Sequence, residues 1–321
     1  MGISLGAEQA AGTAPPGRGL RRLLGALDSP TALRRLALAS VVVNVLIVVT
    51  GGAVRLTDSG LGCPSWPACS GSDPIPTHEF GIHKAIEFGN RSLTFVVGAV
   101  VLLTLVSAWR QHREARLAVL AFLGVPAQAV LGGIVVLTDL NPWLVALHFL
   151  LSAGIVAVTI LLWWRLAGRS ATAVTAPRSA TLLARGLAAL AAGVLALGTI
   201  VTGTGPHAGD PDQNGRIHRI HLSTAAMTQL HADAVMVLIG ASVGMLALTY
   251  ALHLAAPVRK AAAVLVAVEL AQGIIGFTQY LLHVPALLVV FHMFGACLVW
   301  LAALSLLLLL EPAAGRVTAP G

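Results

Sequence analysis

Three histidines of this chain lie within long apolar stretches, where their side chains are expected to be buried: His148, His231 and His292. For any single one, the ordinary explanation is a histidine hydrogen-bonded to a neighbouring helix. An ionisable group within a membrane span is nevertheless costly to bury, and it commonly marks a functional site. Neutral imidazole is the usual axial ligand of haem iron, so these residues are candidate iron ligands.

Two of these histidines belong to a sequence repeat. Gln128 precedes His148 by 20 residues, Gln272 precedes His292 by the same 20 residues, and each histidine lies early in an apolar run. These equivalent positions favour a functional role over simple packing. The repeat predicts two half-molecules that each bury a histidine in a membrane.

Depth in the membrane relates His231 to His292. At about 1.5 Å per residue, each lies roughly 10–14 Å into its expected span from the same side. Two histidines at matching depth on helices of one bundle can hold a planar macrocycle from both faces. A zinc site would need more His, Cys or carboxylate ligands nearby, and the sequence places none at that depth.

In the first half of the sequence, the counterpart of His231 is Asn90, which follows Glu87 on the same helix face. Glu87 has three possible roles: a solvated helix end, a salt bridge with the nearby Arg91, or a carboxylate that handles protons beside a cavity. Asp233 and Glu269 are further acidic candidates within spans, and the sequence assigns them no partner.

Cys63 and Cys69 lie close together in an expected loop. Their spacing does not fit the Cys-x-x-Cys-His pattern of covalently attached haem. The loop is expected on the oxidising side of the membrane, which favours a disulfide, with a local or redox role as open as a structural one. Cys297 lies inside a span and is expected to be a core residue.

The composition identifies the elements that must position these residues. The chain is 57% hydrophobic and 10% charged, with a mean hydropathy of +0.86, whereas a soluble domain carries about 25% charged residues. Apolar runs of about 20 residues cross a bilayer as helices, in which every backbone group is paired internally. We therefore predict an all-α polytopic membrane protein, with eight transmembrane helices arranged as two pseudo-symmetric four-helix bundles. The expected spans are 36–56, 87–109, 117–137, 143–164, 183–203, 222–249, 261–281 and 286–310.

Two of these spans end in matching clusters of threonine and glycine, Thr50-Gly51-Gly52 and Thr202-Gly203-Thr204-Gly205. Small residues allow the close approach of another helix, which is the commoner reason for them, or of a flat ligand.

Basic residues set the expected orientation. Of the 20 lysines and arginines, 15 lie on one side of the spans, and the positive-inside rule places that side, with both termini, in the cytoplasm of a multi-pass cell-membrane protein. These residues account for the net charge of +7, so nucleic-acid binding is not expected. Residues 1–35 lack the apolar region of a signal peptide. The expected divisions are a disordered cytoplasmic tail (1–35), an N-terminal half (36–164), a cytoplasmic linker (165–182), a C-terminal half (183–310) and a second cytoplasmic tail (311–321).

Residues 36–310 resemble the haem A synthase family. The most specific motif covers residues 50–69 and reads Thr-Gly-Gly-Ala-Val-Arg-Leu-Thr-x-Ser-Gly-Leu-Gly-Cys-Pro-x-Trp-Pro-x-Cys. The resemblance also rests on the Glu87 motif, on the segment 201–210 that follows the fifth span, and on the three in-span histidines. It implies an oxidoreductase that converts a ring methyl of haem O to the formyl group of haem A by successive hydroxylations, for cytochrome oxidase assembly.

The resemblance also implies roles for particular residues. A haem b would be held in the C-terminal half by His231 and His292, and the substrate haem O in the N-terminal half with His148 as one iron ligand. Glu87 matches the essential glutamate of the family, and Cys63 and Cys69 match its outer-loop cysteine pair, expected as a disulfide. Further candidates for haem contacts are Arg91, Thr202, Gly203 and His207.

One position departs from the family pattern, which has a second histidine where this chain has Asn90. Asparagine is a poor iron ligand, so the substrate iron is expected either to be five-coordinate or to be reached by His83 from the loop. The partners implied by the resemblance are a haem O synthase and cytochrome oxidase assembly factors, and an oligomer is compatible with it.

Two other classes of protein compete with this interpretation. A b-type cytochrome that only transfers electrons would need two equivalent bis-histidine sites, and Asn90 breaks one of them. A transporter is favoured by the repeat of two halves, but it would leave the buried histidines without an explanation.

Overall fold

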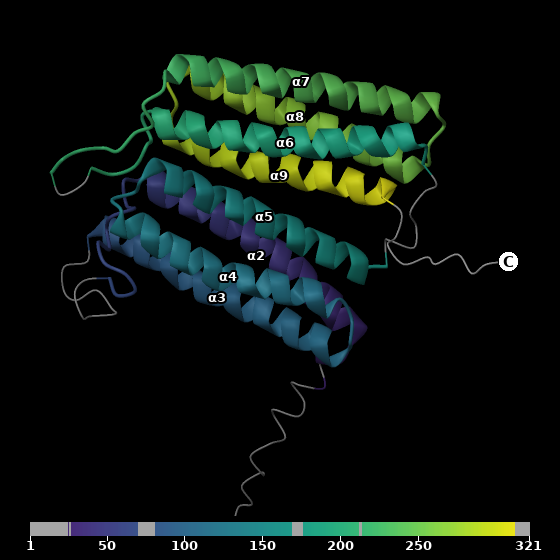
Figure 1. The fold of residues 1–321 in the computed structure, drawn as a ribbon, viewed down its shortest axis with the longest axis horizontal. Helices are drawn as coiled ribbons and strands as arrows, with labels where there is room; N and C mark the ends of the chain where they lie inside the picture. Colours follow the sequence, from purple (N-terminus) through teal and green to yellow (C-terminus); the bar gives the residue numbers. More distant parts are fainter. Residues whose placement is uncertain (1–24, 26, 70–80, 169–175, 212–213, 312–321) are drawn as a thin grey trace, which may run out of the picture.

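The computed structural model describes residues 25, 27–69, 81–168, 176–211 and 214–311 (Figure 1). In this part of the chain all regular structure is helical, and eight helices are long and apolar enough to cross a membrane. They are α2 (Pro30–Leu56), α3 (Ile82–Arg110), α4 (Ala115–Leu137), α5 (Pro142–Leu166), α6 (Arg178–Thr204), α7 (Thr224–Ala251), α8 (Ala256–Leu281) and α9 (Ala286–Leu310). The prediction of an all-α membrane protein with eight spans is confirmed.

Several helices extend beyond the apolar runs that predicted them. The helix α2 begins at Pro30 rather than at residue 36, because a proline fits the first turn, where its missing N–H is not needed. Likewise α3 begins at Ile82 rather than at residue 87. The connection between the halves is shorter than residues 165–182, because α5 ends at Leu166 and α6 begins at Arg178. Most of the two expected tails, residues 1–24 and 312–321, lies outside the described residues.

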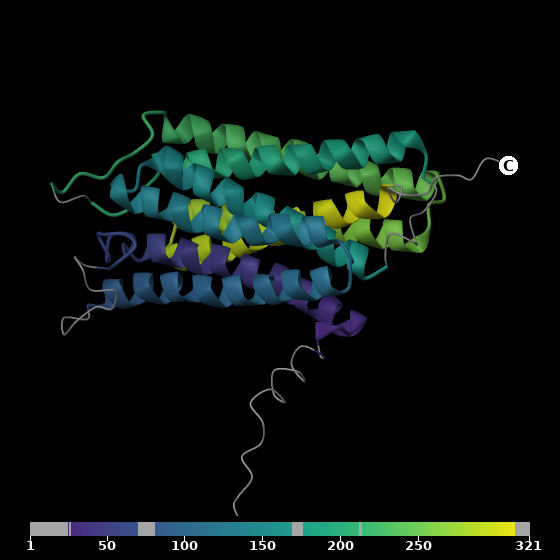
Figure 2. The ribbon, with the colours of Figure 1, turned by 60° about the horizontal axis from the view of Figure 1, so that its bottom comes forward.

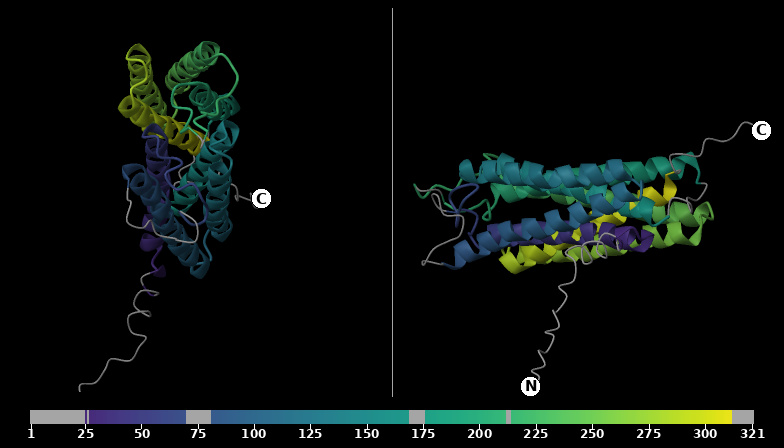
Figure 3. Two further views of the ribbon diagram at one scale, coloured as in Figure 1. Left: turned by 90° about the vertical axis from the view of Figure 1, so that its left-hand side faces the viewer. Right: turned by 90° about the horizontal axis from the view of Figure 1, so that it is seen from below.

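The helices form two rings of four, seen as lower and upper groups in Figure 1 and end-on in Figure 3. In the first ring α2 contacts α3, α3 contacts α4, α4 contacts α5, and α5 contacts α2. The helices α6, α7, α8 and α9 close the second ring in the same order. Among the described residues, the backbones of the diagonal pairs α3/α5 and α7/α9 do not approach each other closely. The pseudo-symmetry of the two rings stays a prediction.

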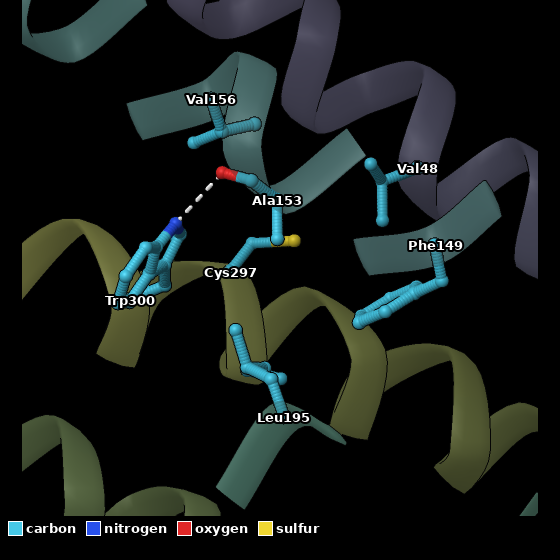
Figure 4. A pocket seen from close by; sticks show the side chains of 8 residues that line it. Val48, Phe149, Ala153, Val156, Leu195, Cys297 and Trp300 are labelled. Atoms are coloured by element: carbon cyan, nitrogen blue, oxygen red, sulfur yellow. Dashed lines mark hydrogen bonds between the residues drawn. The ribbon is translucent and has the colours of Figure 1, made fainter. Parts of the chain in front are cut away.

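The helix α9 joins the second ring to the first, since it also contacts α2 and α5. Met293 of α9 packs on Gly52 of α2, where a larger side chain would collide with its thioether. The Trp300 indole N–H donates to the carbonyl oxygen of Ala153 on α5 at 2.9 Å, as Figure 4 shows. Cys297 is buried in the apolar cavity beside them, so it is a core residue as predicted.

The loops at the two ends of the rings differ, as Figure 2 shows along the length of the helices. We call the end that holds residues 57–69 the disulfide end and the other the opposite end. The largest buried cluster of apolar side chains lies in the second ring toward the opposite end, and includes Leu187, Leu238, Met245, Leu265 and Leu306. In α7 every buried side chain lies from Leu238 onward, and in α8 none lies beyond Glu269. The side chains of α7 and α8 therefore pack less densely toward the disulfide end.

A matched turn precedes α5 and α9. Asp139 and Leu140 have φ angles of 50° and 57°, and His283 and Val284 have φ angles of 59° and 62°. This left-handed conformation is uncommon for residues other than glycine. In each turn the second residue donates its N–H to the last turn of the preceding helix, at 2.9 and 2.7 Å. The sequence repeat thus extends to the backbone that fixes where α5 and α9 begin.

Candidate functional site

Each in-span histidine packs against a glycine of the neighbouring helix in its ring. A Cβ atom on that glycine would lie 3.0–3.3 Å from the imidazole Cε1: Gly132 for His148, Gly198 for His231 and Gly276 for His292. A larger side chain at any of these positions would displace the imidazole. The Nδ1 atoms of all three histidines are buried. Those of His148 and His292 have no partner among the described residues, and the His231 imidazole lies within reach of the Val194 backbone on α6. Because Nδ1 is covered by the neighbouring helix, Nε2 is the ring nitrogen available to a ligand.

The two glutamines of the sequence repeat hold the backbones of two of these histidines. Gln128 Nε2 donates to the carbonyl oxygen of His148 at 2.9 Å, and Gln272 Nε2 donates to that of His292 at 2.7 Å. The facing glycine follows each glutamine by one helical turn. The pattern Gln-x-x-x-Gly on α4 and α8 therefore makes two contacts with the same histidine of the neighbouring helix. The glutamine binds the backbone of the histidine, and the glycine makes room for its imidazole. The sequence contained this signal in both repeats.

The histidines of the second ring come from diagonal helices, His231 from α7 and His292 from α9. The backbones of the two helices are well apart in the described structure, yet the two imidazoles are near enough for their charges to interact. They therefore approach each other across the interior of the second ring, in the half where the side chains pack less densely.

The corresponding diagonal of the first ring joins His148 on α5 to Asn90 on α3. Asn90 Oδ1 accepts a hydrogen bond from the Thr50 hydroxyl of α2 at 2.8 Å, so the asparagine is held by its neighbouring helix. His83 lies at the start of α3, roughly 10 Å from the level of Asn90 at about 1.5 Å per residue. It is exposed, and its Nδ1 pairs with the Ser59 hydroxyl at 3.1 Å. In this conformation His83 contacts the loop from the first turn of α3 and does not reach the level of Asn90.

Glu87 is buried, with only 4% of its surface exposed. Its Oε1 accepts hydrogen bonds from Arg91 Nε at 3.0 Å and Arg91 Nη2 at 2.5 Å, and its Oε2 accepts the backbone N–H of Cys63 at 2.5 Å. Arg91 also donates to the carbonyl oxygens of Cys63 and Ser65, at 2.8 and 2.9 Å. The prediction that Glu87 lies at a solvated helix end is therefore wrong. Glu87 and Arg91 form an ion pair, and both residues bind the backbone of the loop that contains Cys63.

Cys63 and Cys69 form a disulfide, as expected. We call residues 57–69 the disulfide loop. Trp66 of this loop packs its indole on Gly133 of α4, where a Cβ atom would lie 2.5 Å from the ring. Gly133 adjoins Gly132, which faces His148. The disulfide loop thus lies over the first ring next to the histidine, a contact that the sequence did not predict.

A second loop joins the disulfide end of α2 to the second ring. Arg55 donates to the carbonyl oxygens of His207 and Ala208, at 2.6 and 2.7 Å. His207 Nε2 lies 2.9 Å from the carbonyl oxygen of Val284, in the turn before α9. His207 is thereby engaged in contacts within the protein. The sequence did not single out Arg55, whose partners lie more than 150 residues further along the chain.

The threonine and glycine cluster that ends α6 has a packing explanation. A Cβ atom on Gly203 would lie 2.7 Å from the Ile220 side chain, so the glycine permits this close contact. The Thr202 hydroxyl donates to the Gly198 carbonyl oxygen of its own helix at 2.8 Å. Asp233 is exposed on α7, where its carboxylate accepts a hydrogen bond from Gln229 at 2.7 Å.

Asp210 joins the second loop to the disulfide loop. Only 6% of its surface is exposed, and its Oδ2 accepts the N–H of Leu61 at 2.9 Å. Burial raises the pKa of Asp210 above its ordinary value of 3.8. The hydrogen bond from the Leu61 N–H opposes this increase in part, and the charge of Asp58 adds to it.

This shift predicts how stability depends on pH. Because the pKa is higher in the folded state, the folded state binds the proton more tightly than the unfolded state. The resulting stability is fully present below pH 3.8 and is lost as the pH rises through the raised pKa. We expect Asp210→Asn, which keeps an acceptor for Leu61 and does not titrate, to remove this dependence. The melting temperature of the detergent-solubilised wild type should fall relative to the variant across that window, and a constant difference would refute the prediction.

No cluster of three or more His, Cys, Asp or Glu side chains in the described residues could hold a metal ion by itself. The imidazole donors are instead a pair in the second ring, His231 and His292 on diagonal helices, and a single histidine in the first ring, His148. Fold and site together define a polytopic membrane protein whose two four-helix rings each bury imidazole toward the disulfide end.

Comparison with known proteins gives the family. Residues 34–304 match the COX15-CtaA family, described as cytochrome oxidase assembly protein, and the chain belongs to this family. It is 34% identical over 140 residues to a heme A synthase of Geobacillus thermodenitrificans, covering 41% of this chain and 43% of the relative. It is 37% identical over 135 residues to a heme A synthase of Lysinibacillus sphaericus, covering 40% and 43%. The aligned segments thus span less than half the length of these relatives.

Proposed function

We propose that this protein is a haem A synthase, which oxidises a ring methyl of haem O to the formyl group of haem A. The observation that carries the proposal is the difference between the two rings. The second ring brings His231 and His292 toward each other, whereas the first sets His148 opposite Asn90 under a loop clamped by Glu87. The family and the names of its curated relatives support the same function.

The second ring fits a resident haem b. Its donors are two imidazoles whose Nδ1 atoms are buried against the neighbouring helices. Gly198 and Gly276 give the rings room to stand against those helices. When bound, haem b would supply reversible one-electron transfer. His231 and His292 would hold its iron and fix its plane across the ring.

The first ring suits a haem that arrives, reacts and leaves. His148 would orient haem O through its iron, and Asn90, held by Thr50, would leave the other face without a protein ligand. Conversion of the methyl carbon to the formyl carbon removes four electrons and four protons, and an external electron acceptor would take up the electrons. Two hydroxylations give a hydrated aldehyde, and loss of water then gives the formyl group. Glu87 would take or relay protons near that carbon, as a positioned carboxylate can.

The orientation and the partners belong to the same proposal. The disulfide end would face the oxidising side of the cell membrane, which is where disulfides persist. The opposite end, with most of the basic residues and both termini, would face the cytoplasm. A haem O synthase would supply the substrate, and cytochrome oxidase assembly factors would receive the product.

A single preparation tests the function. The protein would be purified from a host that makes haem O but has no haem A synthase of its own, and its pigments extracted and identified after a reduced-minus-oxidised spectrum. Haem b together with haem O or haem A supports the proposal. Haem b alone would identify an electron-transfer cytochrome, and the absence of haem would favour a transporter.

The paired glutamines give a prediction with an internal control. Gln272→Leu removes the donor to the His292 carbonyl oxygen, so we expect haem b to be retained about 10-fold or more weakly, as for other groups that orient a metal ligand. Gln128→Leu should leave the haem b spectrum unchanged and lower haem A output, because it acts on His148. Haem b titration and pigment analysis of both variants measure this. An equal effect of both variants on haem b would contradict it.

A further inference from the structure

One face of α8 changes character in the middle of the helix. From the opposite end to the disulfide end it carries Val258, Ala262, Leu265, Glu269, Gln272, Gly276 and Gln279. Residues at these spacings of three and four lie on one side of a helix. Before Glu269 this face is apolar and fully buried, and after Glu269 it is polar except for the glycine that faces His292.

Glu269 itself is a buried carboxyl group that the proposed reaction does not use. Only 3% of its surface is exposed. Its Oε1 accepts a hydrogen bond from the Ser242 hydroxyl of α7 at 2.9 Å. Its Oε2 is buried and has no partner among the described residues. An ionisable group so placed within a span marks a functional site by default.

Other atoms along the same face share this lack of partners. Gln272 Oε1, Gln279 Oε1 and His292 Nδ1 are all buried without a hydrogen-bond partner in the described part of the chain. Buried polar atoms are rarely left unpaired, and ordered water commonly satisfies them. Together with Glu269 Oε2 they form a line of unpaired polar atoms along α8, which extends roughly 15 Å from Gln279, near the disulfide end, to Glu269.

The first ring has the middle of this line, since Gln128 Oε1 and His148 Nδ1 are also buried without a partner among the described residues, but it lacks the two ends. At the spacing that relates the two halves, Gln272 and Gly276 match Gln128 and Gly132, but Glu269 matches Val125 and Gln279 matches Val135. Val125 packs against the apolar cluster of the first ring. The polar face is therefore not a requirement of the repeated fold, and it accompanies the ring with two histidines.

We propose that Glu269 is a proton-exchange site, reached from the disulfide end along α8, that takes up a proton when the haem between His231 and His292 is reduced. This inference rests on the haem b site proposed above. The iron(III) gains one electron from a one-electron donor, such as a membrane quinol or a chemical reductant. The Glu269 carboxylate gains one proton from water at the disulfide end and becomes a carboxylic acid. The total charge buried in the ring is then unchanged, which avoids the cost of an uncompensated charge.

The other titratable groups on α8 and on the two helices that pack against it lie far from Glu269 or have another role. On α7, His231 and Asp233 lie roughly 13 Å or more from the level of Ser242, toward the disulfide end, and Tyr250 lies near the opposite end beside Arg259. On α9 the titratable groups are His292, the proposed ligand, and Cys297, which faces the first ring. On α8 the others are Arg259, Lys260 and Tyr280, near its two ends.

The test is a redox titration of the purified holoprotein at several pH values, followed by its b-type absorption. The wild-type midpoint potential should fall toward about 59 mV per pH unit, the value for a tenfold change in proton activity and one electron. Glu269→Gln keeps the size of the side chain and an acceptor for Ser242, and it should make the potential independent of pH. Glu114→Gln, a surface carboxylate paired with Arg165, should leave the slope unchanged.

The infrared difference spectrum between oxidised and reduced wild-type protein provides a measurement that needs no variant to fold. It should contain a carboxylic-acid band that appears on reduction and shifts in heavy water. A flat wild-type potential, or an unchanged slope in Glu269→Gln, would overturn the role of Glu269 while leaving the haem site standing. A wild-type protein without a b-type spectrum would overturn both proposals.

Discussion

His292→Ala is expected to abolish the low-spin b-type spectrum of the purified protein. The His292 imidazole stands against Gly276, its backbone is held by Gln272, and it approaches His231 across the second ring. Alanine leaves that side of the ring without a donor. The methionine nearest in sequence, Met293, packs on Gly52 of the first ring and is turned away from the site.

The matched control is His148→Ala, which removes the equivalent residue of the sequence repeat. We expect this variant to keep the b-type spectrum and to lose haem A output, because the substrate iron would have no protein ligand. Reduced-minus-oxidised spectra, with haem content per protein, compare the two variants. An unchanged spectrum in His292→Ala would refute its role as a ligand. Loss of the b-type spectrum in both variants would refute the division of labour between the rings.

Loss of a histidine can also destabilise the fold, so the variants need a check for folding. His148 and His292 are only partly buried, and the densest cores lie toward the opposite end of the rings. We therefore expect both alanine variants to be recovered from the membrane as helical protein. Helical content by circular dichroism separates loss of the site from loss of the fold.

The helices and the repeat were predictable because their signals are local. Apolar runs long enough to cross a bilayer identify the helices, and spacing alone relates Gln128 and His148 to Gln272 and His292. The helix ends were less predictable, since α2 and α3 continue through polar turns beyond the apolar runs. A hydropathy profile does not detect those polar turns. Pro30 was a local signal for the start of α2, because proline is favoured in the first turn of a helix.

The contacts that complete the site were not predictable in the same way. Arg55 reaches the backbone at His207, Trp66 reaches Gly133, and Asn90 pairs with Thr50 of another helix. Each contact joins residues that are distant in sequence, and each depends on how helices pack and how loops cross the end of a ring. A backbone carbonyl oxygen carries no sequence identity, so no residue pattern could have marked the partner of Arg55.

Glu87→Gln is expected to stop haem A formation while leaving haem b bound. The amide has one acceptor oxygen, so it can keep the hydrogen bond from the Cys63 N–H while its NH2 group replaces the oxygen that faces Arg91. Arg91 can still donate to the carbonyl oxygens of Cys63 and Ser65, so the disulfide loop should stay in place. The amide can no longer accept a proton at neutral pH. Loss of general acid–base catalysis typically costs 10²–10⁴-fold in rate, so we expect haem A output to fall by about 100-fold or more. Pigment extraction and the b-type spectrum measure the two parts of the prediction.

The alternative is that Glu87 only anchors the loop, and Trp66→Ala distinguishes the two roles. That variant removes the packing of the disulfide loop on Gly133 and leaves the bonds of Glu87 to Arg91 and Cys63 intact. If the carboxylate handles protons, Trp66→Ala should keep much of the haem A output, although amide hydrogen exchange in residues 57–69 becomes faster. If the loop alone matters, Trp66→Ala should lose output and Glu87→Gln should keep it. Normal output from Glu87→Gln would therefore remove Glu87 from the chemistry and leave it as a structural support for the loop.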